Sequence, residues 1–311
     1  MIVAFIDAYR DRFGVEPICA VLTEHGMPIA PSTYYALRKR PVSDANLADA
    51  YAANALHAIW TANFEVYGVR KLWHEATRQG HSWGRDQVAR LMGIAGIRGV
   101  VRGEHRVRTT EAEPKNPRHP DLVKRDWDAP TTQDQLWVAD FTYVWTLTGF
   151  VYVAFVVDVF SRRVLGWTVS RTRTWHLVAS VLRQAVSLRG RSDTCFTATG
   201  LVHHSDAGSQ YTALAFAKEL RESGIAGSIG TVGDALDNAL MESAIGLFKT
   251  ELIDRHPTTW QDRLDVEKAV AAWVRWFNHD RLHSSIGYLP PVEFEQHHAT
   301  PKTAELEPEA A

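Results

Sequence analysis

Three acidic residues have positions that together suit metal-dependent chemistry. Asp140 interrupts an apolar stretch, where an unpaired buried charge would be costly. Asp206 follows a short apolar run and precedes a loop of small residues, a position at which α/β sheets bind ligands. Glu242 lies in a stretch with helical periodicity. Taken singly, Asp140 could be a turn former and Glu242 a solvated helix residue.

A fold that brings the three carboxylates together would offer oxygen ligands to Mg²⁺, for which Mn²⁺ can substitute. Two such ions about 4 Å apart activate a water or a hydroxyl and stabilise the leaving oxygen of a phosphodiester during in-line displacement. The sequence therefore contains the side chains needed for a two-ion site that acts on a phosphodiester.

The helical stretch around Glu242 carries two further polar residues on the same face. Asn238 lies four residues before it and Lys249 seven residues after it, and a helix of 3.6 residues per turn aligns all three. Lys249 would then lie about 10 Å along the helix, within reach of a neighbouring phosphate or a terminal base. A solvated lysine is the alternative. His204, two residues before Asp206, is expected to support the site or to contact DNA.

The elements that must position these residues follow from hydrophobic periodicity. Three consecutive strands joined by short turns predict an antiparallel unit, and the alternating helices and strands that follow predict a mixed α/β sheet. The predicted strands are 136–145, 150–160, 164–170, 201–204 and 225–229, and the predicted helices are 175–188, 211–223, 237–253 and 260–278. The three acids then come from a strand, a strand end and a helix.

An all-α region is expected before the sheet, because residues 1–100 have helical periodicity and few β-branched runs. A helix, a turn at Gly26 and a basic helix form the outline of a helix-turn-helix. This outline predicts DNA binding, with contacts from the basic helix through Arg38, Lys39 and Arg40. A plain pair of helices is the alternative.

Composition divides the rest of the chain. Residues 101–130 contain prolines and scattered charges without periodicity, which predicts a linker. Basic residues outnumber acidic ones between Arg70 and Arg125, although the net charge of the chain is −2. This stretch is expected to contact a polyanion, with a solvated linker surface as the alternative. Residues 131–298 form the predicted catalytic core, and 299–311 form an acidic tail.

Whole-chain composition excludes several classes of protein. With 311 residues, of which 45% are hydrophobic and 23% charged, the chain is expected to form globular domains rather than a disordered or fibrous protein. Two cysteines are too few for a disulfide framework. No apolar run approaches the roughly 20 residues that span a bilayer, and the first residues lack the pattern of a leader peptide. A cytoplasmic protein without a membrane role is therefore expected.

The spacing of the acids and the residues around them resemble a known family. Thirty-five residues separate Asp206 from Glu242, which is similar to the Asp, Asp, thirty-five residues, Glu signature of retroviral-type integrases and bacterial insertion-sequence transposases. The surrounding motifs are WVADFTY (137–143), HSDAGSQY (204–211), DNALMES (237–243), NHDRLH (278–283) and PP (290–291). In this order they resemble the downstream reading frame product of the insertion-sequence-three family of transposases.

This resemblance implies a ribonuclease-H-like core with helices on both faces of the mixed sheet. It implies that Asp140, Asp206 and Glu242 are the catalytic, metal-binding triad, which holds two Mg²⁺ ions. It also implies that Lys249 contacts the DNA end, with Asn238 beside it. The implied activity is DNA transposition, in which hydrolysis exposes a 3′-hydroxyl at the element end and that hydroxyl attacks a target phosphodiester by transesterification.

The resemblance also implies partners. These are element-end and target DNA, further copies of the chain on DNA, and an upstream-frame protein that supplies end recognition, with the acting protein located at the bacterial nucleoid. Ala244 and Ile245 depart from the two aromatic residues common in the family, which affects the packing of the helix rather than its metal face. A hydrolytic nuclease on the same core and a non-catalytic DNA-binding protein are the competing hypotheses.

Overall fold

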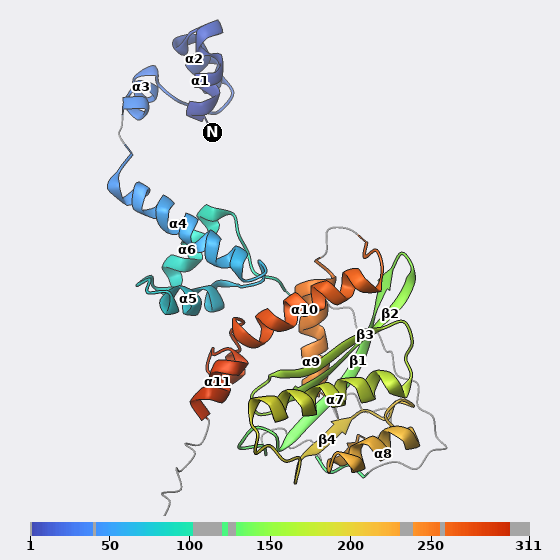
Figure 1. The fold of residues 1–311 in the computed structure, drawn as a ribbon. Helices are drawn as coiled ribbons and strands as arrows, with labels where there is room; N and C mark the ends of the chain where they lie inside the picture. The colour runs from blue at the N-terminus through green and yellow to red at the C-terminus, as the bar shows by residue number, and fades with distance from the viewer. Residues whose placement is uncertain are drawn as a thin grey trace, which may run out of the picture. The chain divides into compact units, whose positions relative to one another are not determined.

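The computed structural model of the protein describes residues 2–39, 42–101, 120–123, 129–230, 239–255 and 259–298 (Figure 1). The chain forms two compact units, Met1–Leu56 and His57–Ala311. Most of the predicted linker and the whole of the predicted acidic tail lie outside the described residues. The domain boundaries proposed from the sequence, including the linker at 101–130, therefore stay predictions.

The first unit is a small group of helices with its own apolar core. Its helices are α1 (Ile2–Phe13), α2 (Val15–Glu24), α3 (Pro31–Lys39) and the first part of α4 (Asp44–Ala62). Ile6, Leu22 and Tyr34 are buried together, and the Tyr34 hydroxyl donates to Asp7 Oδ1 at 2.8 Å. Gly26 has a φ of +79° between α2 and α3, a conformation that glycine adopts without steric cost. The predicted all-α region before the sheet is confirmed.

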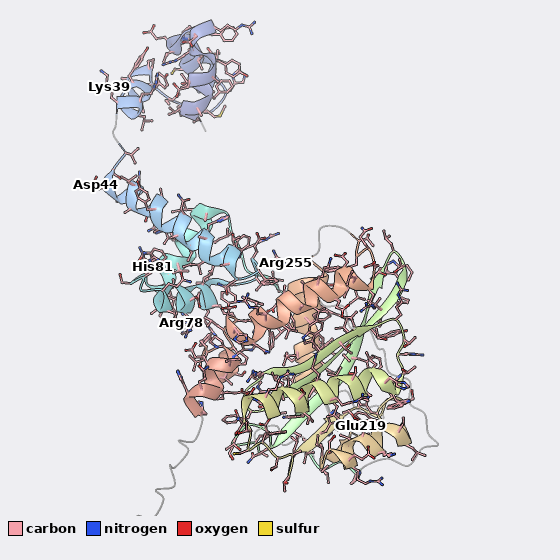
Figure 2. The ribbon with its side chains drawn as sticks, viewed as in Figure 1. Lys39, Asp44, Arg78, His81, Glu219 and Arg255 are labelled. Atoms are coloured by element: carbon pink, nitrogen blue, oxygen red, sulfur yellow. The ribbon has the colours of Figure 1, made fainter. Side chains whose placement is uncertain are left out.

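The second unit begins with helices that pack against the C-terminal part of the chain. After the end of α4 come α5 (Val69–Arg78) and α6 (Arg85–Ala95), and the C-terminal helices are α10 (Arg263–His279), η3 (Ser284–Ile286) and α11 (Pro291–His298). The indole N–H of Trp276 in α10 donates to Asn63 Oδ1 at 3.1 Å, and Phe64 packs on the same indole. Arg78 in α5 donates twice to the Glu293 carboxylate in α11, at 2.6 and 3.1 Å (Figure 2). These helices are therefore joined to the sheet domain by specific contacts.

A five-stranded sheet forms the centre of the second unit. Its strands are β1 (Leu136–Thr146), β2 (Gly149–Asp158), β3 (Val164–Ser170), β4 (Val202–Ser205) and β5 (Ala226–Ile229). They lie in the order β3-β2-β1-β4-β5, in which β1 to β3 are antiparallel neighbours and β4 and β5 run parallel to β1. Parallel strands need crossover connections, which α7 (Trp175–Ser192) and α8 (Leu214–Glu222) supply. The predicted mixed α/β sheet is confirmed.

Helices cover both faces of the sheet (Figure 1). Because alternate residues of a strand point to opposite faces, Ala154 and Val156 of β2 pack with α7 and α8, whereas Phe155 contacts Phe248 and Trp273. Phe248 is the last residue of α9 (Ala239–Phe248), and Trp273 lies in α10. The unbroken apolar character of β2 follows from this double coverage.

A buried ionic cluster ties α11 to the end of the sheet at which β2 finishes. Arg189 at the end of α7 donates to Glu295 at 2.7 and 2.9 Å and to Asp134 at 2.7 Å. Arg163 and Ser161, after β2, also donate to the Glu295 carboxylate. Burial alone would raise the pKa of Glu295, but Arg189 and Arg163 outweigh it and hold this pKa below its ordinary value. The cluster therefore anchors α11 at the end of the sheet where β1 begins.

The helices predicted in the sheet domain are observed with shifted ends: α7 extends to Ser192, α8 begins at Leu214, and the last two differ as follows. The last of them begins at Arg263 rather than at Trp260, because Trp260 pairs with Thr146 next to the β1–β2 turn. The described part of the predicted helix 237–253 is α9 followed by η2 (Lys249–Ile253), a π-helical turn. Across the described residues, no helix is both long and apolar enough to cross a membrane.

Candidate active site beside β1 and the end of β4

Asp140 lies in β1 on the face that α9 covers. Its partner across the antiparallel pair is Phe155, and directly opposed residues project to the same face of a sheet. Phe155 contacts Phe248 of α9, so Asp140 belongs to that side. The backbone N–H of Phe141 donates to Asp140 Oδ1 at 2.7 Å, which holds the carboxylate in one orientation.

Asp206 reaches the same edge of the sheet through parallel pairing. The last paired residues of β1 and β4 are Ala139 and Ser205, so Asp140 and Asp206 each come one residue beyond them. Because β1 continues to Thr146 whereas β4 ends at Ser205, Asp206 follows the end of β4 beside the middle of β1, and the carboxyl end of such a strand is where α/β sheets bind ligands. The loop after Asp206 passes close to its carboxylate, since a Cβ on Gly208 would lie 3.4 Å from Oδ1. A larger side chain at this position would crowd the acid.

Glu242 is exposed in the first turn of α9, a helix that packs against β1. Burial raises the pKa of Asp140 well above its ordinary value, and the negative charges of Asp206 and Glu242 raise it further. The Phe141 N–H and the charge of Lys249 act in the opposite direction. The structure therefore brings two acids and one lysine within electrostatic reach of Asp140.

The donor set at this edge fits a divalent cation. All three acids supply oxygen, the ligand that Mg²⁺ prefers, and a cation would neutralise the negative charge that raises the pKa of Asp140. As placed, no three His, Cys, Asp or Glu side chains of the described residues stand close enough together to hold one ion. Like charges repel in the absence of a cation, and Glu242 is the exposed member of the set.

Lys249 is the first residue of η2, seven residues beyond Glu242. Its Nζ lies 5.0 Å from the centre of the Tyr143 ring in β1, within the range of a cation–π contact. Burial lowers the pKa of Lys249, and the charges of Asp254 and Asp140 oppose this shift. Lys249 is therefore a half-buried cation beside β1, close to the acids.

Replacing Asp140 by asparagine is expected to stabilise the metal-free protein at neutral pH. The amide can still accept the Phe141 N–H, but it carries no buried charge. Because folding raises the pKa of Asp140, the ionised carboxylate destabilises the fold above that pKa, and the penalty disappears as the pH falls below the ordinary value of 3.8. Urea unfolding at pH 7 with a chelator should give a higher midpoint for Asp140→Asn, and the difference should shrink at acidic pH. An unchanged midpoint at neutral pH would contradict this expectation.

Comparison with known proteins shows the family to which the chain belongs. A model described as an integrase core domain matches residues 130–235, a second of the same description matches 223–291, and an HTH-like domain matches 47–105.

The chain is 45% identical over 269 residues to a putative transposase for insertion sequence element IS986/IS6110 of Mycobacterium tuberculosis (strain CDC 1551 / Oshkosh), covering 86% of this chain and 95% of that protein. It is 42% identical over 296 residues to the transposase for insertion sequence element IS629 of Shigella sonnei, covering 94% of each. The chain belongs to the insertion-sequence-three family of transposases.

The transposase also resembles solved integrase structures, at low sequence identity. Against the HTLV-2 integrase catalytic core domain in complex with magnesium (dimeric form), the TM-score is 0.40 and the identity 16%, over 53% of this chain and 98% of that one. Against a simian T-cell lymphotropic virus intasome in complex with PP2A regulatory subunit B56 gamma, the TM-score is 0.45 and the identity 16%, over 79% of this chain and 75% of that one.

Family membership confirms the class of enzyme and fold predicted from the sequence. The transposase is a polynucleotidyl transferase with an integrase core domain, and its mixed sheet with helices on both faces is ribonuclease-H-like. DNA binding is supported by the HTH-like domain. This match covers α4, α5 and α6, downstream of the α2 and α3 pattern on which the helix-turn-helix prediction rested.

The predicted DNA-contact residues are spread over both units. Arg38 and Lys39 are exposed at the end of α3 in the first unit, where Arg38 Nε lies 3.5 Å from Asp7 Oδ1. Asn238 and Arg40 lie outside the described residues. Contact of these four residues with DNA stays a prediction.

His204 lies inside the sheet rather than on its surface. It belongs to β4 with 1% of its surface exposed, and a hydrogen bond of 2.8 Å joins its Nδ1 to Ser228 Oγ in β5. The same hydroxyl accepts the Leu122 N–H at 2.9 Å. A ring buried this deeply does not reach a DNA backbone, so of the two predicted roles only support of the strand that carries Asp206 fits this placement.

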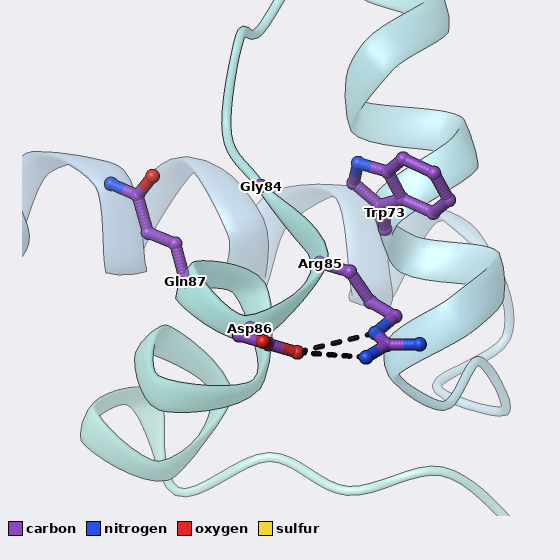
Figure 3. Close-up of a pocket in the computed structure, with 5 residues that line it drawn as sticks. All are labelled: Trp73, Gly84, Arg85, Asp86 and Gln87. Carbon is purple, nitrogen blue, oxygen red and sulfur yellow. Dashed lines mark hydrogen bonds and ion pairs between the residues drawn. The ribbon is translucent and has the colours of Figure 1, made fainter.

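The beginning of α6 was not singled out by the sequence analysis. A pocket of about 350 Å³ lies there, lined by Trp73, Gly84, Arg85, Asp86 and Gln87 (Figure 3). The sequence pattern that indicates this surface is the spacing of Val88 and Leu91, which are both buried. Gln87 and Arg90 lie on the opposite, exposed face of the helix. Exposed residues of these types on a helix of an HTH-like domain suit contact with DNA.

Proposed function

We propose that the transposase uses Asp140, Asp206 and Glu242 to bind two Mg²⁺ ions, hydrolyses a phosphodiester at the element end, and transfers the cut strand to target DNA. The position of Asp140 in β1 beside the end of β4, where burial and the charges of Asp206 and Glu242 raise its pKa, supports this proposal. Ions bound there would activate the attacking oxygen and stabilise the leaving oxygen. Mn²⁺ is expected to substitute.

The three acids differ in how firmly neighbouring groups hold them in place. Asp140 is held by the Phe141 N–H within a strand that has neighbours on both sides. The loop after Asp206 is secured by Gln210, whose side-chain amide donates to the Arg173 carbonyl at 2.9 Å. Glu242 is exposed on a helix. The two aspartates thus form the rigid part of the proposed site, and the glutamate completes it when the substrate and ions are bound.

The two proposed steps balance without a covalent enzyme intermediate. In hydrolysis, a water oxygen bonds to phosphorus, the bond from phosphorus to the 3′-oxygen of the element end breaks, and a proton from the water passes to that oxygen. In strand transfer, the resulting 3′-hydroxyl oxygen bonds to a target phosphorus, the target's own phosphorus–oxygen bond breaks, and the proton passes to the departing oxygen. Both steps are displacements at phosphorus, so one set of acids can serve both.

A joining assay distinguishes strand transfer from simple hydrolysis. Precut element ends with a 3′-hydroxyl are expected to be joined to a target plasmid. Ends that carry a 2′,3′-dideoxy terminus should not be joined, because the attacking oxygen is missing. A hydrolytic nuclease on the same core, the second candidate function, would cleave uncut ends but join neither substrate, and that result would contradict strand transfer.

DNA is expected to contact two regions of the second unit. The HTH-like domain exposes Arg85, Gln87 and Arg90 on α6, residue types that contact phosphates and base edges. Lys249, beside the acids, suits the end of the cut strand. Because two element ends and a target must be held together, we expect a homo-oligomer on DNA. An upstream-frame protein is a further proposed partner for end recognition.

Lys249→Ala is expected to lower cleavage at the element's own end about tenfold, because a hydrogen bond to a charged group contributes roughly 1.5–3 kcal/mol. Nicking of unrelated DNA should change less, and folding should be unaffected because the side chain is only half-buried. Both rates are measured on the same preparations, with Lys249→Arg as the control that keeps the charge. Equal losses on the two substrates would contradict a role in end recognition.

A further inference from the structure

The π-helical turn η2 lies between the candidate active site and the HTH-like domain. Lys249 is its first residue, and Glu251 follows two residues later, about 200° around a regular helix. Lys249 is half-buried beside β1, whereas Glu251 faces the interior with 7% of its surface exposed. Short π-helical segments are frequent at functional sites. Contacts that hold Glu251 in place therefore also fix the position of Lys249 on the opposite side of the turn.

Glu251 is held by a buried arginine from the C-terminal part of the chain. Arg281 donates from Nε and Nη2 to the Glu251 carboxylate at 2.5 to 3.1 Å, and from Nη1 to the Leu282 carbonyl. Burial lowers the pKa of His283 well below its ordinary value. The neutral ring donates from Nε2 to the Phe277 carbonyl and accepts from Arg281 Nη1 at Nδ1. The guanidinium is thus held on several sides, which gives the Glu251 carboxylate one orientation.

Two contacts tie this ion pair and η2 to the HTH-like domain. The Tyr67 hydroxyl accepts the N–H of Leu282, the residue next to Arg281, at 2.7 Å. Arg255, just after η2, donates to the Glu65 carbonyl at 2.9 Å and to the Glu65 carboxylate at 3.1 Å (Figure 2). Glu65 and Tyr67 both lie within the segment that matches the HTH-like domain.

We propose that Glu251 is a positioning residue for Lys249, fixed by Arg281 and by the contacts of the HTH-like domain around η2. The inference rests on the proposed role of Lys249 at the DNA end. The two side chains are only two residues, about half a turn, apart, and the links through Arg281 and Tyr67 are buried, so they hold a fixed geometry. The same contacts then fix the position of the HTH-like domain relative to Lys249. DNA bound by that domain and the strand end bound at the acids are thereby held at a constant separation.

A double-mutant cycle tests whether Glu251 acts through Lys249. In the full-length transposase, Glu251→Gln is expected to lower cleavage of the element's own end about tenfold, but less than about twofold in a Lys249→Ala background, because residues that act as a unit have non-additive effects. A role confined to stability would lower cleavage by the same factor in both backgrounds. Additive losses would therefore overturn the proposal, as would wild-type end cleavage by Lys249→Ala alone.

Glu295→Gln is the matched control for this cycle. Glu295 is 6% exposed and is bound by Arg189 and Arg163 at the other end of the sheet, so the substitution removes the same charge from an equally buried ion pair. Its effect on end cleavage is expected to be the same with and without Lys249. If Glu295→Gln were as strongly coupled to Lys249 as Glu251→Gln, the specific role of Glu251 would be overturned.

Arg255→Ala provides a second variant that does not depend on a buried charge. Arg255 and Glu65 are partly exposed, and such pairs contribute little to stability, so the protein is expected to stay folded by circular dichroism. It should lower end cleavage about threefold with Lys249 present and leave it unchanged in Lys249→Ala. The absence of this coupling would contradict the link to the HTH-like domain.

Asp206→Asn, measured in the same assay, separates failure of this inference from failure of the proposed function. Cleavage that survives in Asp206→Asn would contradict the proposed function. Loss of cleavage in Asp206→Asn together with additive cycles would contradict only the positioning role of Glu251.

Discussion

Replacing Asp140, Asp206 or Glu242 by its amide is expected to lower cleavage of the element end about a thousandfold or more, in Mg²⁺ or in Mn²⁺. Each amide keeps the shape of the side chain but removes a charge that the proposed ions require. The exposed surface of the HTH-like domain is unchanged, so affinity for DNA should change only a few-fold. Cleavage of a labelled end and binding to the same DNA are measured on the same preparations.

The control for these variants is Glu219→Gln. Glu219 lies in α8 and pairs with Arg183 of α7 at 2.9 Å, in an ion pair that does not involve the three acids (Figure 2). It is expected to cleave at the normal rate. Near-normal cleavage by any one of the three amide variants would remove that residue from the catalytic set, and the expected stability of Asp140→Asn ensures that its loss of cleavage does not reflect unfolding.

A chain that begins at residue 130 is expected to melt about 10 °C or more below one that begins at residue 42, although the integrase core match itself starts at 130. The shorter chain loses the Asn63 side chain that accepts the Trp276 N–H and the hydroxyl of Tyr67 that accepts the Leu282 N–H. An unpaired buried polar group costs about 1–3 kcal/mol, and a large apolar side chain returned to water costs a similar amount.

The chain from residue 42 is the matched control, because it keeps all of α4 and the complete HTH-like match. Thermal unfolding followed by circular dichroism compares the two chains at equal concentration. Equal melting temperatures would show that the sheet domain folds without the helices of the HTH-like domain. A lower melting temperature for the chain that begins at residue 130 would show that the sheet domain and the helices of the HTH-like domain fold as one unit. This agrees with the compact unit from His57 onward.

Much of the sheet domain could be predicted from the sequence. The strand predicted at 136–145 is observed as β1 (Leu136–Thr146), and this inference succeeds because strand periodicity and turn residues are properties of a few neighbouring positions. A charge within such a run is also a local property, and it makes Asp140 a candidate whose role stays a proposal. The family motifs depend likewise on short strings and on one spacing, between Asp206 and Glu242.

Only the tertiary structure decided which polar residues are paired and which face solvent. Glu251 and Arg281 are 30 residues apart, and Tyr67 and Leu282 are 215 residues apart. The sequence predicts that His204 supports the site or contacts DNA, and the structure buries it in β4, where it is hydrogen-bonded to Ser228 of β5. A charged or polar residue has the same local pattern whether it is solvated or held by a distant partner. Its role is therefore determined by the packing of segments that are far apart in the chain, which local periodicity does not encode.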